Sequence, residues 1–281
     1  MIKKTLAFIC LSLLLFGCAT QPSATIPSAS EENNLPPTQE APTLQPTAEP
    51  APFRVVAYVT TNIIPGTIPY ERLTHINYSF LLPNDDGTFA KLVNGWKLKE
   101  IVTDAHAADV QVLISVGGWG WEKEFEAMAA DPVTRTAFVT NLKAIVDEYE
   151  LDGADVDWEY PQAGESASNY LKLMQEIDAA MPDKLITTAV VSHGSNAEGL
   201  PDETFEIFDF VNVKTYDDVN HGSMEQFETG LNYWLERGLP PEKLVIGLPF
   251  YSRPGGIPFK KIVDGQPDAC LLYTSPSPRD S

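Results

Sequence analysis

LDGADVDWEYP, residues 151–161, is the stretch that decides the fold. Acidic and apolar residues alternate in it, which is the pattern of a β-strand with two different faces. Asp155, Asp157 and Glu159 therefore share one face, and the residues between them share the other. Burying three like charges is costly, so a function or a partner must require them; a solvated acidic edge is the alternative.

Short apolar runs of this kind occur seven times, and each is bounded by turn or cap residues. The predicted strands cover residues 54–59, 75–81, 110–116, 153–158, 185–191, 208–215 and 244–250. Amphipathic stretches such as 134–149 and 167–181 lie between them and predict helices. Strands that alternate with helices predict an α/β fold with an all-parallel sheet.

The architecture that we expect is a (β/α)8 TIM barrel whose eighth strand is missing from this chain. A doubly wound sheet is the alternative. Polar, chemically reactive residues follow the ends of several predicted strands, as they do in barrel enzymes. The first predicted strand is not followed by a Gly-rich phosphate-binding fingerprint. Both observations favour the barrel.

The composition is that of a folded and strongly acidic protein. Its 281 residues are 43% hydrophobic, and 39 acidic side chains stand against 19 basic ones, for a formal charge of −20. This charge repels a phosphate backbone, so we expect no nucleic acid partner and a neutral or cationic substrate. Cysteine occurs only at positions 10, 18 and 270, so neither a disulfide nor a cysteine metal site is expected in the body.

A metal site is the main competing interpretation of the three carboxylates. Asp155 and Glu159 are separated by about 13 Å along a strand, so the three side chains do not converge easily on one ion. The four histidines show no metal-binding spacing. We therefore expect no metal and no cofactor. Crowded carboxyl groups share protons instead, and a carboxyl kept protonated near neutral pH can act as a general acid on a glycosidic oxygen.

Residues 1–18 have the pattern of a secretory signal, with two lysines and an apolar run too short to span a bilayer permanently. The run closes on Leu15-Phe-Gly-Cys18, which resembles the lipobox of bacterial lipoproteins. Cleavage there leaves Cys18 as a lipid-bearing N-terminus, so we expect export and a membrane anchor in the cell envelope, at the outer membrane or cell surface. An ordinary signal with a chance cysteine is the alternative.

The segments on either side of the body are not expected to fold. Residues 19–52 are rich in proline and poor in large apolar side chains, which predicts a linker. We expect the folded body to cover residues 53–269. Residues 270–281, which begin CLLYTSPSPRD, resemble the translation of a transposase sequencing adapter. Our hypothesis is that this segment is an artefact and that the natural C-terminal part is missing.

Four motifs now carry a specific resemblance. They are DGADVDWE at 152–159, SVGG at 115–118, Tyr216-Asp217, and GLPFY at 247–251. Together they resemble the DGxDxDxE, SxGG, Tyr-Asp and seventh-strand motifs of glycoside hydrolase family 18, the chitinase family. The motifs occur in the order of the family and span residues 53 to about 253. The resemblance implies the TIM barrel and a glycosidase activity.

The resemblance also implies roles for the residues at the matching positions. Glu159 is expected to protonate the leaving oxygen, while the acetamido group of the sugar itself attacks the anomeric carbon. Asp157 is expected to orient that acetamido group and to stabilise the cationic oxazolinium, with Asp155 tuning its charge. Tyr216 is expected to donate to the acetamido carbonyl. Asp152 is expected to be structural.

Further residues are expected around this group. Tyr58 and Ser115 match positions that support the two aspartates by hydrogen bonds, and Asp217 completes the Tyr-Asp motif at the substrate. Trp119 and Trp121 follow the two glycines and suit stacking on a sugar face, with packing as the alternative for each. His193 and Tyr251 are weaker candidates, while Trp158 and Trp234 are expected in the core.

Lys214 departs from the family pattern. The family commonly has Met or Gln at this position. Lys214 shares its strand face with Tyr216, so a cation here is predicted to pair with Asp157 or Glu159 and to favour their charged forms. Its consequence is a shifted pH optimum, a contact with an acidic or unusual sugar, or a degenerate site. A side chain that reaches into solvent is the alternative.

The resulting hypothesis is a glycoside hydrolase that needs no cofactor. It cleaves β-1,4 bonds next to N-acetylglucosamine in chitin or its oligosaccharides with retention of configuration. Its partners are an N-acetylglucosamine-containing polysaccharide and, through the lipid anchor, a membrane. The alternatives are an endo-β-N-acetylglucosaminidase for peptidoglycan or N-glycans, a catalytically weak chitin-binding lectin, and a substrate-binding lipoprotein of a transporter.

Overall fold

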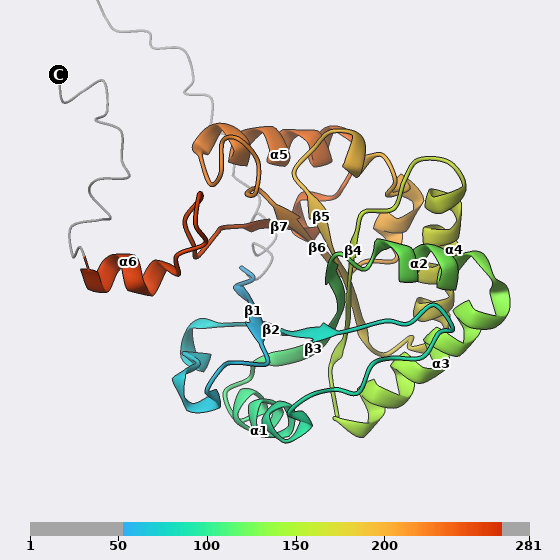
Figure 1. The fold of residues 1–281 in the computed structure, drawn as a ribbon, viewed down its shortest axis with the longest axis horizontal. Coiled ribbons are helices and arrows are strands. Elements are labelled where there is room, and N and C mark those ends of the chain that lie inside the picture. The colour runs from blue at the N-terminus through green and yellow to red at the C-terminus, as the bar shows by residue number, and fades with distance from the viewer. Residues whose placement is uncertain (1–52, 266–281) are drawn as a thin grey trace, which may run out of the picture. The chain divides into compact units, whose positions relative to one another are not determined.

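The computed structural model describes residues 53–265 (Figure 1). The predicted signal 1–18 with Cys18, the predicted linker 19–52 and the predicted artefact 270–281 lie outside the described residues, so they stay predictions. Within residues 53–265, none of the helices is both long enough and apolar enough to cross a membrane.

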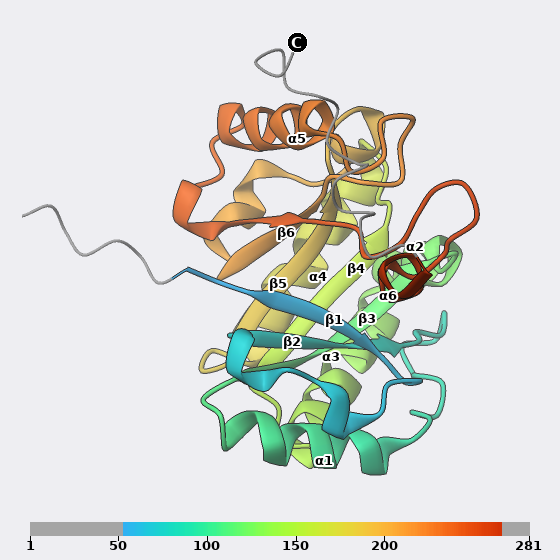
Figure 2. The same ribbon diagram turned by 90° about the vertical axis from the view of Figure 1, so that its left-hand side faces the viewer.

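The body is built on one seven-stranded parallel sheet in which each strand pairs with the next along the chain. The sheet curls, so that its two outermost strands approach one another (Figure 2). The Arg54 guanidinium, just before the first strand, donates to the backbone oxygen of Glu242, just before the last strand, at 2.5 Å. The strands are β1 (Val56–Thr60), β2 (His75–Leu81), β3 (Gln111–Trp119), β4 (Gly153–Glu159), β5 (Leu185–Val191), β6 (Phe210–Lys214) and β7 (Leu244–Gly247).

This order confirms the predicted (β/α)8 TIM barrel without its eighth strand. A doubly wound sheet reverses its strand order at a switch point, whereas β1 to β7 follow one another without reversal. Within residues 53–265, β1 pairs only with β2 and β7 only with β6. One consequence is that the inward-facing ring of Tyr58 on β1 is still 37% exposed.

Helices cover the outer face of the curled sheet (Figure 1). The longest of them begins where Asp131 accepts a hydrogen bond from the Val133 amide, with a proline in the first turn, which is a strong helix-start signal. The α-helices are α1 (Gly95–His106), α2 (Glu122–Ala130), α3 (Pro132–Glu148), α4 (Glu165–Ala180), α5 (Met224–Glu236) and α6 (Phe259–Gly265), and the 3-10 helices are η1 (Pro65–Thr67), η2 (Tyr70–Arg72), η3 (Ser195–Ala197), η4 (Asp202–Glu206) and η5 (Pro241–Lys243).

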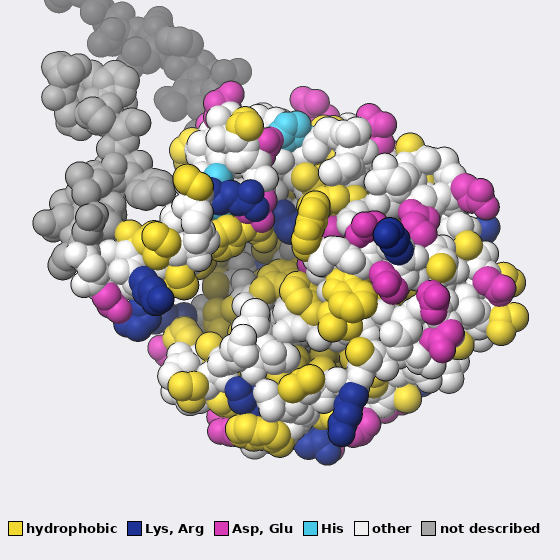
Figure 3. Space-filling model, viewed as in Figure 1, with side chains coloured by type: hydrophobic (Ala, Val, Ile, Leu, Met, Phe, Trp, Pro, Cys, Tyr) yellow, Lys and Arg dark blue, Asp and Glu magenta, His cyan; other side chains and the backbone are white. Residues whose placement is uncertain are grey.

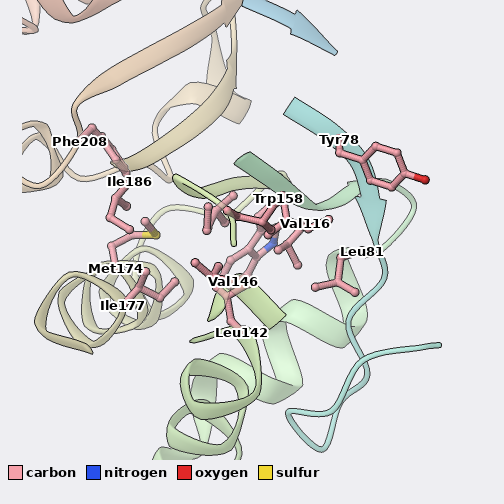
Figure 4. Packing of buried hydrophobic residues seen from close by; sticks show 14 of the residues in the cluster. Tyr78, Leu81, Val116, Leu142, Val146, Trp158, Met174, Ile177, Ile186 and Phe208 are labelled. Carbon is pink, nitrogen blue, oxygen red and sulfur yellow. The ribbon is translucent and has the colours of Figure 1, made fainter. Parts of the chain in front are cut away.

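The hydrophobic core lies between the sheet and these helices. Trp158 on β4 points outward into it and stacks on Phe125 of α2, with ring centroids 5.0 Å apart. Val116, Leu142 and Val146 surround the same indole in the packing seen in Figure 4. The outward face of β4 is thus apolar, which leaves its acidic face for the interior of the barrel.

Two aspartates clamp neighbouring strands at their N-terminal ends. Asp152, just before β4, donates its amide to the Val112 carbonyl on β3 and accepts the Val112 amide on its carboxylate at 2.6 Å. Asp209, just before β6, makes the same double contact with Ile186 on β5, and its carboxylate accepts the amide at 2.8 Å. Asp152 also pairs with His106 at 2.9 Å. Both aspartates fix the pairing of adjacent strands.

Candidate active site at the C-terminal ends of the strands

Three carboxylates line the inner face of β4, as the alternation of its sequence predicted. Asp155 is fully buried and Asp157 is 3% exposed, while Glu159 at the end of the strand is half-buried. The residues between them pack outward with the helices. The alternative of a solvated acidic edge is therefore wrong.

Asp155 is held by donors from four other strands. Its Oδ2 atom accepts the hydroxyls of Tyr58 at 3.0 Å and Ser115 at 2.7 Å. Its Oδ1 atom accepts the Thr187 hydroxyl at 2.6 Å and the Asn212 amide at 3.3 Å. Burial raises the pKa of the Asp155 carboxyl, and hydrogen bonds to its charged form oppose this rise. The saturated carboxylate is a fixed element of the site.

Sequence reasoning placed Tyr58 and Ser115 beside the aspartates but missed Thr187 and Asn212. Both lie inside mainly apolar strands, in LITTAVV and FVNVK. Thr187 is in register with Asp155, and Asn212 lies two residues before Lys214, on the same face of β6. A polar residue at an inward position of a buried strand was the signal that could have found them.

Lys214, the last residue of β6, bridges the other two carboxylates. Its Nζ atom lies 2.8 Å from Asp157 Oδ1 and 2.9 Å from Glu159 Oε1, and its side chain is only 12% exposed. The ammonium also lies 5.0 Å from the ring centroid of Tyr160. Burial lowers the pKa of Lys214, but the two carboxylates outweigh it, so the pKa lies above its ordinary value. The alternative that Lys214 reaches into solvent is wrong.

The acidity of Asp157 is shifted toward neutral pH. Burial raises the pKa of its carboxyl to about 7, the Lys214 ammonium works in the opposite direction, and the charges of Glu159 and Asp155 add to the rise. At neutral pH the protonated and ionised forms of this carboxyl are therefore both populated. A carboxyl that titrates near the working pH is a common feature of catalytic sites.

Tyr216 follows β6 and points toward the same interior. Burial raises the pKa of its phenol to about 12, so the hydroxyl keeps its proton and remains a hydrogen-bond donor. Its ring packs edge-on against Tyr251 with centroids 6.2 Å apart. The geometry thus suits the donor role that the resemblance implies for Tyr216.

The Asp217 carboxylate pairs with residues of the segment after β7 rather than with the carboxylate row. It accepts the Tyr251 hydroxyl at 2.6 Å and pairs with Arg253 at 2.7 Å. His221 Nδ1 accepts the Asp217 amide at 3.1 Å. A cavity of about 520 Å³ lies beside this group, with Asp218, Val219, His221, Tyr251, Arg253, Pro254, Gly255 and Gly256 in its wall. Figure 3 shows a hollow on this face of the molecule with hydrophobic side chains along its walls.

A model of the glycosyl hydrolases family 18 matches residues 54–257. The chain belongs to family 18. Its sequence is 25% identical to Chitinase 1 of Aphanocladium album over 68% of this chain, and the chain spans no more than 57% of the length of the first curated relatives that it matches.

Two solved structures of chitinases are similar to this chain. A chitinase from Bacteroides thetaiotaomicron is 27% identical, with a TM-score of 0.69 over 77% of this chain and 78% of that chain. A family 18 chitinase mutant from Cycas revoluta in complex with (GlcNAc)4 is 26% identical, with a TM-score of 0.63 over 69% of this chain and 68% of that chain.

The SxGG motif of this family 18 chain has a steric explanation. Gly117 has a φ of 105°, and a Cβ atom there would lie 2.5 Å from the Phe125 ring and 2.6 Å from the Asp157 backbone oxygen. Gly118 has a φ of 88°, and its Cβ would lie 3.0 Å from the Phe80 ring. Only glycine allows this backbone to approach β4 so closely.

Among the tryptophans of the family 18 domain, Trp96 on α1 and Trp119 are exposed, and the other three pack. Trp119 at the end of β3 is 81% exposed and in register with Glu159, so its ring is available to a ligand beside the acid. Trp121 packs against the core, which favours the packing alternative. Trp158 and Trp234 are buried in the core, as predicted.

The remaining candidates are a histidine and a metal site. His193 is half-buried, and its Nδ1 atom lies 2.9 Å from the Ser192 hydroxyl, so it is turned toward its own loop. Among residues 53–265, no group of three or more His, Cys, Asp or Glu side chains is arranged to hold a metal ion. The place between Asp157 and Glu159 is taken by the Lys214 ammonium instead.

Proposed function

We propose that this protein hydrolyses β-1,4 glycosidic bonds next to N-acetylglucosamine in chitin or chitooligosaccharides, with retention of configuration. The observation that carries the proposal is the row of three carboxylates on β4, whose exposure increases along the strand. Asp155 is fixed by four donors, Asp157 titrates near neutral pH, and Glu159 lies at the open end of the strand next to an exposed tryptophan.

The mechanism follows from these positions. Glu159 donates its proton to the glycosidic oxygen while the carbonyl oxygen of the substrate's own acetamido group attacks the anomeric carbon. The bond to the leaving sugar breaks, a bond to the acetamido oxygen forms, and a cyclic oxazolinium results. Water then attacks the anomeric carbon, and Glu159, now a carboxylate, takes its proton. Two displacements at one carbon retain its configuration.

The other side chains hold and stabilise this intermediate. Asp157 accepts the acetamido N–H, which aligns the attacking oxygen and balances the positive charge of the oxazolinium. Asp155 is locked by its donors and supports Asp157 from behind. The Tyr216 phenol donates to the acetamido oxygen. The similarity to enzymes named chitinases supports this substrate class.

The test is hydrolysis of chitotetraose by the full chain, followed by separation of the products. Anomeric proton NMR during the first turnovers reports whether configuration is retained. Glu159→Gln is expected to abolish turnover, and the exposed Glu228→Gln on α5 is the matched control with the same charge change. Full activity of Glu159→Gln, or a product of inverted configuration, would refute the proposal. Peptidoglycan and an N-glycan serve as competing substrates.

One observation favours a second candidate, a lectin that binds the glycan without cleaving it. Lys214 lies 2.9 Å from Glu159, so an ammonium already occupies the side of this carboxyl group that a glycosidic oxygen would have to reach. Calorimetric binding of chitotetraose by the folded protein, with no turnover between about pH 4 and 8, would establish the lectin.

We also propose that the protein is exported and held in the cell envelope by lipid on Cys18, with residues 19–52 as a spacer. The support is the lipobox-like Leu15-Phe-Gly-Cys18 sequence. Expression in a bacterial host should give a membrane-bound, acylated protein by mass spectrometry. Cys18→Ala should release it from the membrane fraction; an unchanged distribution would contradict the anchor.

A further inference from the structure

Lys214 contacts the two carboxylates that the proposed chemistry needs for the substrate. In the part of the chain that the structure describes, it is the cation that pairs with the carboxylates of β4, and it pairs with two of them at once. The proposed reaction asks Asp157 to accept the acetamido N–H and Glu159 to carry a proton. In the structure, the Asp157 Oδ1 atom already accepts from the Lys214 ammonium, and Glu159 is paired with it.

The surroundings of the ammonium contain no second cation in the described residues that could balance the carboxylates. The titratable groups that interact with it come from several elements: Asp155, Asp157 and Glu159 of β4, Tyr160 just after β4, and Tyr216 just after β6. Tyr58 of β1 donates to Asp155 in the same cluster. Ser115, Thr187 and Asn212 on β3, β5 and β6 add uncharged donors. Lys214 thus compensates a cluster of acidic and phenolic groups.

We propose that Lys214 is a displaceable counter-ion: it holds Asp157 and Glu159 together in the free protein, and the acetamido N–H of the substrate takes its place on Asp157. This inference rests on the proposed function and adds a positioning residue to it. When the ammonium leaves, the attraction that favours two ionised carboxylates is lost, so the pair takes up one proton from solvent, and Glu159 can carry that proton as the general acid.

The side chain is built for such a movement. Lysine carries a compact charge on four flexible methylenes, and its hydrogen bonds are not fixed in a planar fork as those of arginine are. The Tyr160 ring, 5.0 Å from the ammonium, offers a second favourable contact through its π face. Lys214 therefore has a place to stay close to the site after it releases Asp157.

The experiment compares pH profiles of kcat/KM on chitotetraose for the wild type, Lys214→Met and Lys214→Arg. In Lys214→Met we expect the basic limb of the kcat/KM profile to shift to higher pH by about one to three units. The reason is that an opposite charge at this distance lowers the pKa of a carboxyl group by about that many units, and the substitution removes this charge. We also expect a lower KM, because no internal ligand competes for Asp157. Lys214→Arg keeps the charge and is expected to retain the wild-type limb. Lys172→Met, exposed on α4, is the matched control.

Two results would overturn the proposal. One is an unchanged basic limb and KM in folded Lys214→Met. The other is loss of turnover in Lys214→Met with rescue by Lys214→Arg, which would make the cation itself a catalytic group.

A readout without turnover separates this proposal from the proposed function. Carbon-13 NMR of carboxyl-labelled aspartate follows the titration of Asp157, whose signal is assigned by its absence in Asp157→Asn. Removal of Lys214 should raise that titration by about one unit or more; an unmoved titration contradicts the counter-ion. If no variant cleaves chitotetraose, the proposed function fails while the Asp157 titration still decides the role of Lys214.

Discussion

Replacement of Asp157 by asparagine should stabilise the folded protein, and the increase in the free energy of unfolding should depend on pH. Asparagine has nearly the same shape and keeps a side-chain oxygen for the Lys214 ammonium. The folded protein raises the pKa of Asp157 from 3.8 to about 7. The proton is therefore bound more tightly in the folded state, so this contribution to stability is complete below about pH 3.8 and is lost as the pH rises through about 7.

The size of the effect follows from the same shift. About three pKa units correspond to roughly 4 kcal/mol, at about 1.4 kcal/mol per unit. Asp157→Asn should therefore exceed the wild type by up to about 4 kcal/mol near pH 8 and by only about 2 kcal/mol near pH 5. Because both proteins share all other charges, the pH dependence of the remaining acidic surface cancels in the difference.

Urea unfolding at both pH values, followed by tryptophan fluorescence, measures this difference. Asp147→Asn is the control, since its side chain is exposed on α3 in an i,i+4 pair with Lys143, and its effect should be small at both pH values. A stability difference between Asp157→Asn and the wild type that stays constant from about pH 5 to 8 would refute the reasoning. So would a difference that grows toward acidic pH.

Three further predictions concern other parts of the site. Thr187→Val removes a donor from the buried Asp155 carboxylate and should lower the free energy of unfolding by about 1 to 3 kcal/mol, which Thr187→Ser should largely restore in the same urea assay. Gly117→Ala forces a side chain into a contact of 2.5 Å at positive φ, so its thermal midpoint should fall by many degrees, and a midpoint within about one degree of the wild type would contradict this account. Trp119→Ala removes an exposed ring beside Glu159, so KM for chitotetraose should rise about three- to tenfold at unchanged stability; equal KM values would exclude the ring from the substrate path.

The sequence alone was a good guide wherever periodicity decides the structure. Alternation along 151–161 predicted the inward carboxylates, and the predicted strands 75–81 and 185–191 coincide with β2 and β5. The seventh predicted strand, 244–250, was too long: β7 ends at Gly247, because Pro249 has no amide hydrogen for the ladder. The third was too short, since β3 continues through the two glycines to Trp119.

The site was harder to predict because its contacts join distant strands. Parity placed Lys214 on the side of the carboxylates, but only the packing shows that its ammonium contacts both Asp157 and Glu159. Trp119 and Trp121 look alike in the sequence, yet one is exposed and the other packs, because the first ends a strand and the second starts a helix. No local pattern contains that distinction.

The paired hydrogen bonds at Asp152 and Asp209 fix the register of the strands in the barrel. Side chains alternate along a strand, so a slip of β4 by one residue would turn its acids toward the helices and present Ala154, Val156 and Trp158 to the interior. Each of the two aspartates makes two hydrogen bonds to one residue of the neighbouring strand, which is possible in only one register. The acid that would cleave the sugar lies about 23 Å along the strand from the residue that sets this register. A substitution at the N-terminal ends of the strands can therefore inactivate the site without contacting it.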